Sequence, residues 1–204
     1  MVRVKVCGIS DPEAALAAAE AGADAIGLIF APSRRRVTVE RARQIVASLP
    51  PFVSKVGVFV DESGERIAET VEAVGLDTVQ LHGSETPEFA GSCTLPVLKA
   101  IRVRDAGSLA GLAEYRVSAF LLDTYDPEVL GGTGRTFDWS LAVGAALDYR
   151  IILSGGLRAD NILEALDRVR PYGVDVSGGV ETAGSKDPEK IREFVRRVRE
   201  WEYQ

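Results

Sequence analysis

Short runs of β-branched and other apolar residues alternate with longer segments of helical spacing along all 204 residues of the chain. Each such pair is typical of a βα unit, in which a strand is followed by a helix that crosses back over a parallel sheet. The expected strands are Arg3–Cys7, Ala25–Phe30, Lys55–Val60, Thr78–Leu81, Val97–Ile101, Ala119–Asp123, Ile151–Leu153 and Gly173–Ser177. The expected helices are Asp11–Ala21, Val39–Ser48, Gly64–Val74, Glu85–Gly91, Ala106–Glu114, Trp139–Leu147, Asn161–Val169 and Pro188–Trp201.

Eight strands in strict alternation with eight helices predict an α/β fold of the (βα)8 or TIM-barrel type, with eight parallel strands inside eight outer helices. An open, doubly wound sheet uses the same units but usually needs fewer strands. Dividing 204 residues among eight units leaves about 25 for each, with no surplus for a second domain. We therefore expect residues 1–204 to form one barrel domain.

Composition excludes several classes of protein. Hydrophobic residues make up 46% of the chain and charged residues 26%, which is typical of a folded domain. The net charge of −6 gives no electrostatic reason to expect a nucleic-acid partner. No apolar run approaches the 18 or so residues that span a bilayer, and the first residues read as a strand rather than a signal peptide. We expect a cytoplasmic protein.

Two cysteines in unlike contexts, Cys7 and Cys93, suggest neither a disulfide framework nor a zinc site. The single histidine, His82, excludes a site with several histidine ligands. We therefore expect no metal and no cofactor.

In a barrel of this type the active site lies at the carboxyl ends of the strands. That rule brings many polar residues of this chain to one mouth. They are Cys7, Pro32–Arg36, Asp61, Gln80–His82, Arg102, Asp123, Ser154–Gly156 and Ser177–Gly179.

Two glycine-rich turns follow the last two expected strands, Ser154-Gly155-Gly156 and Ser177-Gly178-Gly179. Glycine lets backbone N–H groups approach an anion, and barrels often bind phosphate at these two loops. A single Gly pair would be read as a tight turn. Two such pairs at adjacent loops favour a phosphate site.

Cys7 ends the first expected strand, and it lies on the same side of that strand as Lys5. Val4 and Val6 can pack under the helices, which leaves Lys5 and Cys7 facing the barrel interior. A nearby ammonium would favour the thiolate and lower the pKa of the thiol from about 8.5. The alternative is a small buried apolar side chain.

Asp123 ends an apolar strand, so its carboxyl group must be hydrogen-bonded or lie at the wet mouth, and a structural role in the next loop is the alternative. Asp126 is a reserve acid in the following loop. One guanidinium from Arg34–Arg36 could clamp a carboxylate with help from His82, the alternatives being a solvated loop and a hydrogen-bonded loop histidine. The glycine-rich segment 131–134 could close over a ligand.

Taken together, six segments resemble the phosphoribosylanthranilate isomerase family of tryptophan biosynthesis, in family order and spacing. They are Lys5-Val6-Cys7-Gly8-Ile9, Val79-Gln80-Leu81-His82-Gly83, Leu121-Leu122-Asp123-Thr124, Gly131 to Trp139, Ser154-Gly155-Gly156-Leu157 and Asp175 to Glu181. The resemblance implies a cofactor-free Amadori rearrangement of N-(5-phosphoribosyl)anthranilate to 1-(2-carboxyphenylamino)-1-deoxyribulose 5-phosphate.

The resemblance also implies roles for individual residues. Asp123 matches the general acid, Cys7 the general base and Arg36 the arginine on the anthranilate side. Further substrate contacts are expected from Gln80, His82, Asp175 and Gly132, and phosphate contacts from Ser154, Gly155, Gly156, Ser177, Gly178 and Gly179. Many members of the family have serine where this chain has Gly178. The change removes a side-chain hydroxyl but leaves the backbone N–H donor in place.

Two other activities compete with this interpretation. A related aminoaldose isomerase of histidine synthesis acts on a substrate with two phosphates, but has Asp where this chain has Cys7. A non-catalytic phosphate-ligand binder would keep the glycine loops without needing Cys7 and Asp123. A redox role for Cys7 is disfavoured because no resolving cysteine is near in sequence. The sequence leaves a homodimer open.

Overall fold

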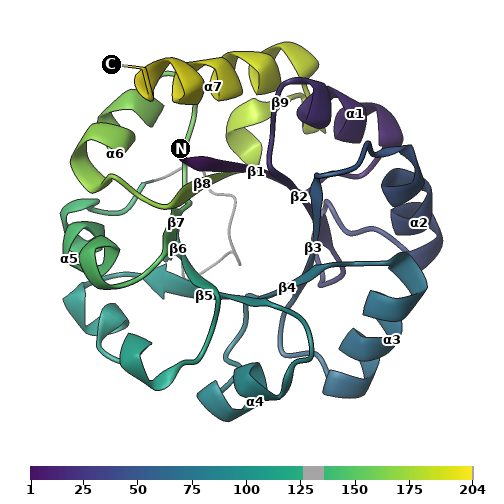
Figure 1. Ribbon diagram of the computed structural model, residues 1–204, viewed down its shortest axis with the longest axis horizontal. Coiled ribbons are helices and arrows are strands. Elements are labelled where there is room, and N and C mark those ends of the chain that lie inside the picture. Colours follow the sequence, from purple (N-terminus) through teal and green to yellow (C-terminus); the bar gives the residue numbers. More distant parts are fainter. Residues whose placement is uncertain (126–135, 204) are drawn as a thin grey trace.

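Eight parallel strands close into a barrel in the computed structural model, which describes residues 1–125 and 136–203 (Figure 1). In barrel order the strands are β1 Arg3–Cys7, β2 Ala25–Ile29, β3 Ser54–Phe59, β4 Thr78–Leu81, β5 Val97–Val103, β6 Ala119–Thr124, β7 Ile151–Leu153 and β8 Gly173–Val176. Around them lie the helices α1 Pro12–Glu20, α2 Val39–Ser48, α3 Gly64–Val74, α4 Pro87–Ser92, α5 Ser140–Asp148, α6 Ile162–Val169 and α7 Pro188–Trp201. The predicted barrel is confirmed.

The segment between β5 and β6 differs from the helix expected at Ala106–Glu114. It forms two short 3-10 helices, η1 Ala106–Leu109 and η2 Leu112–Glu114. Asp105 and Ser108 cap η1 reciprocally through side chain and backbone. Gly107 and Gly111 lie within this stretch, and glycine is a weak helix former, which accounts for the break. A further 3-10 turn, η3 Gly178–Val180, and a hairpin of β9 Glu181–Thr182 and β10 Ser185–Lys186 follow β8.

Alternate residues of each strand serve two separate cores. Outward-facing residues such as Val4, Val6 and Leu81 join the large apolar cluster between the sheet and the helices. Inward-facing residues form a smaller cluster inside the barrel, made of Val56, Leu98, Ala100, Ala119, Leu121 and Ile152. Polar residues of the same inward phase are thereby aimed along the barrel axis.

Helix boundaries follow the capping residues. Asp11 caps α1 by accepting from Ala14 N, and Asp187 caps α7 by accepting from the N–H groups of Glu189 and Lys190. Gly75 ends α3 in the left-handed conformation, at φ 75°. Within the described ranges no helix has the length and apolar character needed to cross a bilayer.

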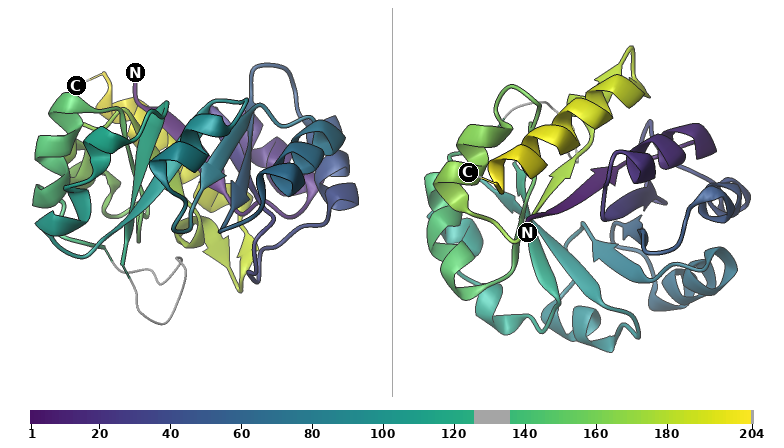
Figure 2. Two further views of the ribbon diagram at one scale, coloured as in Figure 1. Left: turned by 90° about the horizontal axis from the view of Figure 1, so that it is seen from below. Right: turned by 45° about the horizontal axis from the view of Figure 1, so that its top comes forward.

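Asp24 connects three segments at the amino end of the barrel, and the two chain termini lie close together (Figure 2). Its carboxylate accepts from Arg3 Nη1 at 2.7 Å, from Val4 N at 2.8 Å and from Arg199 Nη2 at 2.8 Å. Partial burial pushes the pKa of Asp24 upward, but the Val4 N–H and the two guanidinium groups outweigh it and hold this pKa below its usual 3.8. The contacts join β1, the turn before β2, and α7.

We expect Asp24→Asn to lower the free energy of unfolding by about 1–3 kcal/mol, because two guanidinium groups lose their charged acceptor. Since the carboxyl pKa is lowered by folding, this stabilisation is present above pH 3.8 and is lost as the pH falls through the lower, folded-state value. Urea unfolding of both proteins from pH 7 to pH 3 measures it. Asp160→Asn is the control, because that side chain is 70% exposed and should contribute little. A constant difference between wild type and Asp24→Asn across this pH range would contradict the assignment.

Candidate active site

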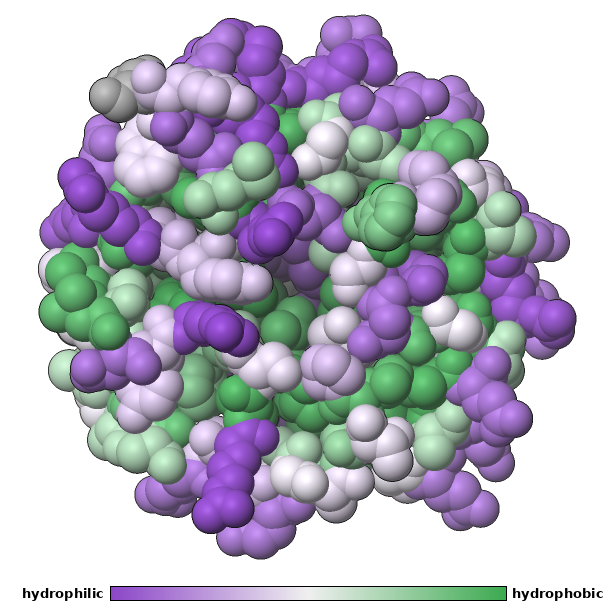
Figure 3. All heavy atoms as spheres, viewed as in Figure 1, coloured by the Kyte–Doolittle hydropathy of each residue, from purple (hydrophilic) through white to green (hydrophobic). Residues whose placement is uncertain are grey.

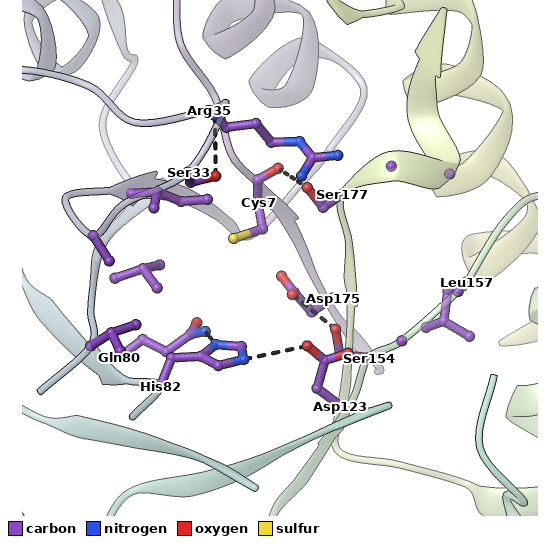
Figure 4. Close-up of a pocket in the computed structure, with 18 of the residues that line it drawn as sticks. Cys7, Ser33, Arg35, Gln80, His82, Asp123, Ser154, Leu157, Asp175 and Ser177 are labelled. Carbon is purple, nitrogen blue, oxygen red and sulfur yellow. Dashed lines mark hydrogen bonds and ion pairs between the residues drawn. The ribbon is translucent and has the colours of Figure 1, made fainter. Parts of the chain in front are cut away.

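A pocket opens at the carboxyl ends of the strands and collects almost every residue that the sequence predicts for the site (Figure 4). Its lining includes Cys7, Gln80, His82, Asp123, Ser154, Gly155, Gly156, Asp175, Ser177, Gly178 and Gly179. These residues come from β1, β4, β6, β7 and β8 and from the loops that follow them. The apolar lining includes Ile29, Val58, Val60 and Leu157, of which only Leu157 belongs to a segment quoted in the sequence analysis.

Among the described residues that the sequence analysis placed at the mouth, Arg36, Asp61 and Arg102 do not line this pocket. Arg36 is exposed, pairs through its backbone with Ile29 and is not among the lining residues. Gly132 lies outside the described residues, as do Asp126 and the segment 131–134. The roles expected for Arg36 and Gly132 remain predictions.

The floor of the pocket holds a buried ion pair beneath Cys7. Lys5 and Asp175 are register partners on β1 and β8, and Lys5 Nζ lies 2.7 Å from Asp175 Oδ1. Ser154 Oγ donates to the other carboxylate oxygen at 3.2 Å. Only 5% of the Lys5 side chain and 6% of the Asp175 side chain are exposed. Two charges removed from water in this way hold each other in place.

Gly27 on β2 makes room for the sulfur and the ammonium side by side. A Cβ atom at this position would lie 2.7 Å from Cys7 Sγ and 3.1 Å from Lys5 Nζ. Ser177 Oγ donates to the Cys7 carbonyl at 3.0 Å and fixes the end of β1. Cys7 and Lys5 therefore share one small space, as their common strand face predicted.

The Lys5 ammonium acts to lower the pKa of the Cys7 thiol, as expected, but the net pKa is raised. Burial raises the pKa of the thiol, and the Asp175 carboxylate adds to the increase, whereas the Lys5 ammonium opposes it. The pKa of Lys5 is itself raised, because the attraction of Asp175 outweighs the burial of the ammonium. The sequence revealed the cation but not the depth of burial or the competing carboxylate.

Asp123, at the carboxyl end of β6, faces His82 from across β5. Asp123 Oδ2 lies 3.3 Å from His82 Nε2, and Gln80 Nε2 lies 2.8 Å from His82 Nδ1. With the Gln80 amide donating to Nδ1, the neutral ring carries its hydrogen on Nε2, toward the carboxylate. Between these two strands, β5 contributes the small side chain of Ala100 to the interior of the barrel.

The two glycine loops approach the site closely and touch each other. Gly155 has φ 82°, and a Cβ atom there would overlap Thr124 Oγ1 and lie 3.0 Å from Asp123 Oδ1. A Cβ atom at Gly179 would overlap the Leu157 carbonyl oxygen. Only glycine leaves this backbone unobstructed. Within the described residues, the N–H groups of Gly155 and Gly156 have no protein acceptor.

Glu181 organises the rim opposite Asp123. It receives Arg35 Nε at 2.6 Å, Arg34 Nη2 at 2.8 Å and Lys186 Nζ at 2.7 Å. Lys186 also donates to the Ser177 carbonyl at 3.0 Å. Burial pushes the pKa of Glu181 upward, but Arg35 and Lys186 outweigh this effect and lower it. Of the three arginines considered from sequence, Arg35 is the one that lines the pocket.

In the described part of the chain, no group of three or more His, Cys, Asp and Glu side chains is suited to hold a metal ion. Groups able to move protons in the pocket include the Cys7 thiol, the Asp123 carboxyl and the His82 imidazole, whereas the Asp175 carboxylate in the same pocket is paired with Lys5. A closed barrel with such a pocket at the carboxyl ends of its strands defines a (βα)8-barrel enzyme.

Comparison with known proteins identifies the family. The protein-family model described as N-(5'phosphoribosyl)anthranilate (PRA) isomerase matches residues 4–197 of this chain. Proteins named N-(5'-phosphoribosyl)anthranilate isomerase are similar to this chain over nearly its full length. The one from Pelobacter propionicus is 54% identical over 202 residues, covering 98% of this chain and 97% of the relative. The one from Geobacter sulfurreducens is 51% identical over 203 residues, covering 98% and 100%.

Solved structures agree with this result. Phosphoribosyl anthranilate isomerase from Thermotoga maritima superposes with a TM-score of 0.92 at 44% identity, covering 98% of this chain and 100% of the other. A phosphoribosyl anthranilate isomerase in complex with reduced 1-(o-carboxyphenylamino)-1-deoxyribulose 5-phosphate superposes at 0.88 and 42% identity, with the same coverage. The chain belongs to the phosphoribosylanthranilate isomerase family, and it is therefore an isomerase, as the six matching segments predicted.

The pKa of Cys7 can be measured by its alkylation. In a Cys93→Ser background Cys7 is the only thiol, since the chain has two cysteines. We expect its rate with iodoacetamide to rise with pH later than that of an ordinary thiol, because only the thiolate reacts and burial disfavours it. Lys5→Met should move the profile to still higher pH, because the ammonium that favours the thiolate is gone while Asp175 remains. An unchanged profile in Lys5→Met would show that the ammonium does not act on the sulfur.

Proposed function

We propose that this chain converts N-(5'-phosphoribosyl)anthranilate into 1-(o-carboxyphenylamino)-1-deoxyribulose 5-phosphate by an Amadori rearrangement, without a metal or cofactor. The observation that carries the proposal is the joint placement of Cys7, Asp123 and both glycine loops around one pocket. An acid, a base and an anion site are the three elements that this reaction requires.

The phosphate is bound by the backbone of the two glycine loops. The N–H groups of Gly155 and Gly156, without an acceptor among the described residues, are available to an anion. Gly178 and Gly179 extend this surface at the start of η3, beside Ser154 and Ser177. Close packing at Gly155 and Gly179 holds these backbone N–H groups rigidly, so little reorganisation accompanies the binding of phosphate.

Asp123 is the general acid that opens the ribose ring. Its carboxyl proton passes to the ring oxygen, the C1–O bond breaks, and the anilino nitrogen supplies the electron pair that forms an iminium ion. Asp123 is left as a carboxylate opposite the His82 Nε2–H, at 3.3 Å. The imidazole thereby stabilises the charge that appears on the acid.

Cys7 is the general base of the second step. The iminium ion acidifies the C2 hydrogen, the Cys7 thiolate removes that proton, and the C–H electron pair forms the C1–C2 double bond and neutralises the nitrogen. The resulting enolamine becomes the ketone when C1 gains the proton held by the Cys7 thiol and the C2 hydroxyl gives its proton, directly or through water, to the Asp123 carboxylate. Both side chains thereby return to their starting states. Lys5 Nζ, held by Asp175, favours the reactive thiolate against the effect of burial.

Hydroxyl and carboxylate groups of the substrate contact polar side chains that line the pocket. Gln80 Oε1 is buried without a donor among the described residues, which suits it to accept from a sugar hydroxyl. Asp175 lies on the pocket floor within reach of the same sugar. Arg36 remains our candidate for the anthranilate carboxylate, and Gly132 for a backbone contact.

We expect Cys7→Ala and Asp123→Asn each to lower kcat by about 10²–10⁴-fold, because each removes one proton-transfer group. Conversion of phosphoribosylanthranilate is followed by the change in anthranilate fluorescence, with unfolding midpoints as a check on folding. Cys93→Ser, which changes the other thiol outside the pocket, is the matched control and should keep full turnover. Full turnover in both site variants, or no conversion by the wild type, would rule the proposal out.

We further propose that the protein is a cytoplasmic homodimer. A solved structure described as generated monomers of the dimeric phosphoribosylanthranilate isomerase from Thermotoga maritima is 40% identical, with a TM-score of 0.89, so that relative is dimeric before it is altered. Large exposed apolar side chains of this chain gather on segments that lead into strands or lie at the termini, and so share one end of the barrel. They are Met1, Phe52, Leu147, Tyr172 and Tyr203. Figure 3, drawn from the same side as Figure 1, shows apolar patches among the polar residues of this face.

Phe52 offers the sharpest test of a dimer, because its side chain is fully exposed at a residue with φ 71°. We expect Phe52→Asp to weaken self-association, since a charge would be buried in an apolar interface. Sedimentation of wild type, Phe52→Asp and the matched change Leu16→Asp on α1 measures it. A wild type that sediments as a monomer at all concentrations would contradict the proposal, as would a dimer insensitive to Phe52→Asp.

A further inference from the structure

A second buried ion pair lies behind the pocket, on the helix-facing side of the sheet. Lys99 is on the outward phase of β5, together with Val97 and Val103. Lys99 Nζ lies 2.7 Å from Glu85 Oε2, and 3% of each side chain is exposed. Neither residue lines the pocket, so neither can touch the substrate.

Both residues of this ion pair hydrogen-bond to Gly83, which immediately follows His82. Gly83 N donates to the two Glu85 carboxylate oxygens at 3.1 and 3.0 Å, and the Gly83 carbonyl accepts from Lys99 Nζ at 2.7 Å. On its other side His82 N donates to the Phe59 carbonyl at 2.8 Å. Both peptide groups next to the imidazole are thus held by fixed partners.

The same carboxylate locks the neighbouring loop against this turn. Asp61 N donates to Glu85 Oε1 at 2.9 Å, while Ser84 N donates to Asp61 Oδ1 at 2.6 Å. Asp61 has φ 49°, an uncommon value for a residue with a side chain, and the contacts hold it there. A Cβ atom at Gly83 would overlap Asp61, so the two loops interlock.

We propose that Lys99 and Glu85 are positioning residues that hold the His82 imidazole against Asp123. Stability alone is a weak reason to bury two charges, because well-packed apolar residues of similar size often serve as well. A rigid backbone at position 83, by contrast, fixes the ring that faces the Asp123 carboxyl. The effect on turnover rests on the function proposed above, whereas the effect on the imidazole does not.

The imidazole can be observed directly, because His82 is the only histidine in the chain. Its ring ¹⁵N signals report which ring nitrogen carries the hydrogen and how the ring contacts Gln80. We expect Lys99→Met and Glu85→Gln to shift and broaden these signals, since the turn after His82 loses one of its partners. Unchanged signals in a folded Lys99→Met protein would overturn the proposal.

Measurements of kcat distinguish a positioning role of Lys99 and Glu85 from a purely stabilising role. We expect Lys99→Met to lower kcat about 10-fold or more, with a smaller change in KM, because a displaced group next to the acid costs rate. The double variant Lys99→Met/Glu85→Gln leaves no unpaired charge and should recover the unfolding midpoint of the wild type. Its kcat and its His82 signals should stay altered, because the Gly83 carbonyl still lacks its donor. If kcat and the His82 signals recovered along with the unfolding midpoint, the proposal would be overturned, because the ion pair would then be purely structural.

Asp24→Asn is the matched control, since it removes a charged contact at the opposite end of the barrel. It should lower the unfolding midpoint and leave kcat and the His82 signals unchanged. If the wild type showed no isomerase activity, the proposed function would fall, and the imidazole signals would still decide the role of Lys99 and Glu85.

Discussion

The ion pair between Lys5 and Asp175 joins the first strand of the barrel to the last. These residues are 170 positions apart in sequence, yet they are register partners where β1 meets β8. Their charges are almost wholly buried, so separating them would leave each without compensation. The pair therefore reinforces the seam between β1 and β8, where backbone pairing also joins Arg3 to Gly173 and Val4 to Val174. It also influences the electrostatic balance around the Cys7 sulfur.

A strict two-residue alternation allows the strands to serve both stability and chemistry. The outward phase buries valine, leucine and isoleucine under the helices, and the inward phase carries apolar residues at mid-barrel. The inward phase becomes polar toward the carboxyl ends, at Cys7, Gln80 and Asp123. Helix packing is thus insulated from the pocket. Lys99 is an exception that uses the outward phase for a buried charge, and its contacts lead back to the residue beside His82.

The strands, the barrel and the residues around the pocket could be predicted because they follow from local periodicity and from one topological rule. Cys7, Asp123 and the glycine loops each end a strand, and the carboxyl ends of barrel strands meet at one mouth. The direction of the Cys7 pKa could not be predicted, because it depends on burial and on Asp175 from the far end of the chain. For the same reason the sequence did not single out Arg35 among the three arginines, and it missed the contacts of Glu181 and Lys99. Their partners are distant in sequence or lie in turns, and no periodic pattern marks a contact of that kind.

The central claim is that a sugar phosphate lies between the sulfur and the carboxyl group with its phosphate on the glycine loops. The most direct measurement is a crystal structure of this chain with reduced 1-(o-carboxyphenylamino)-1-deoxyribulose 5-phosphate, the ligand of a solved relative. The account predicts phosphate oxygens within hydrogen-bond distance of the N–H groups of Gly155 and Gly156 or of Gly178 and Gly179. It also predicts Cys7 Sγ beside C2 and an Asp123 oxygen beside the former ring oxygen. A ligand whose phosphate avoids both loops, or whose sugar contacts only one of the two side chains, would contradict it.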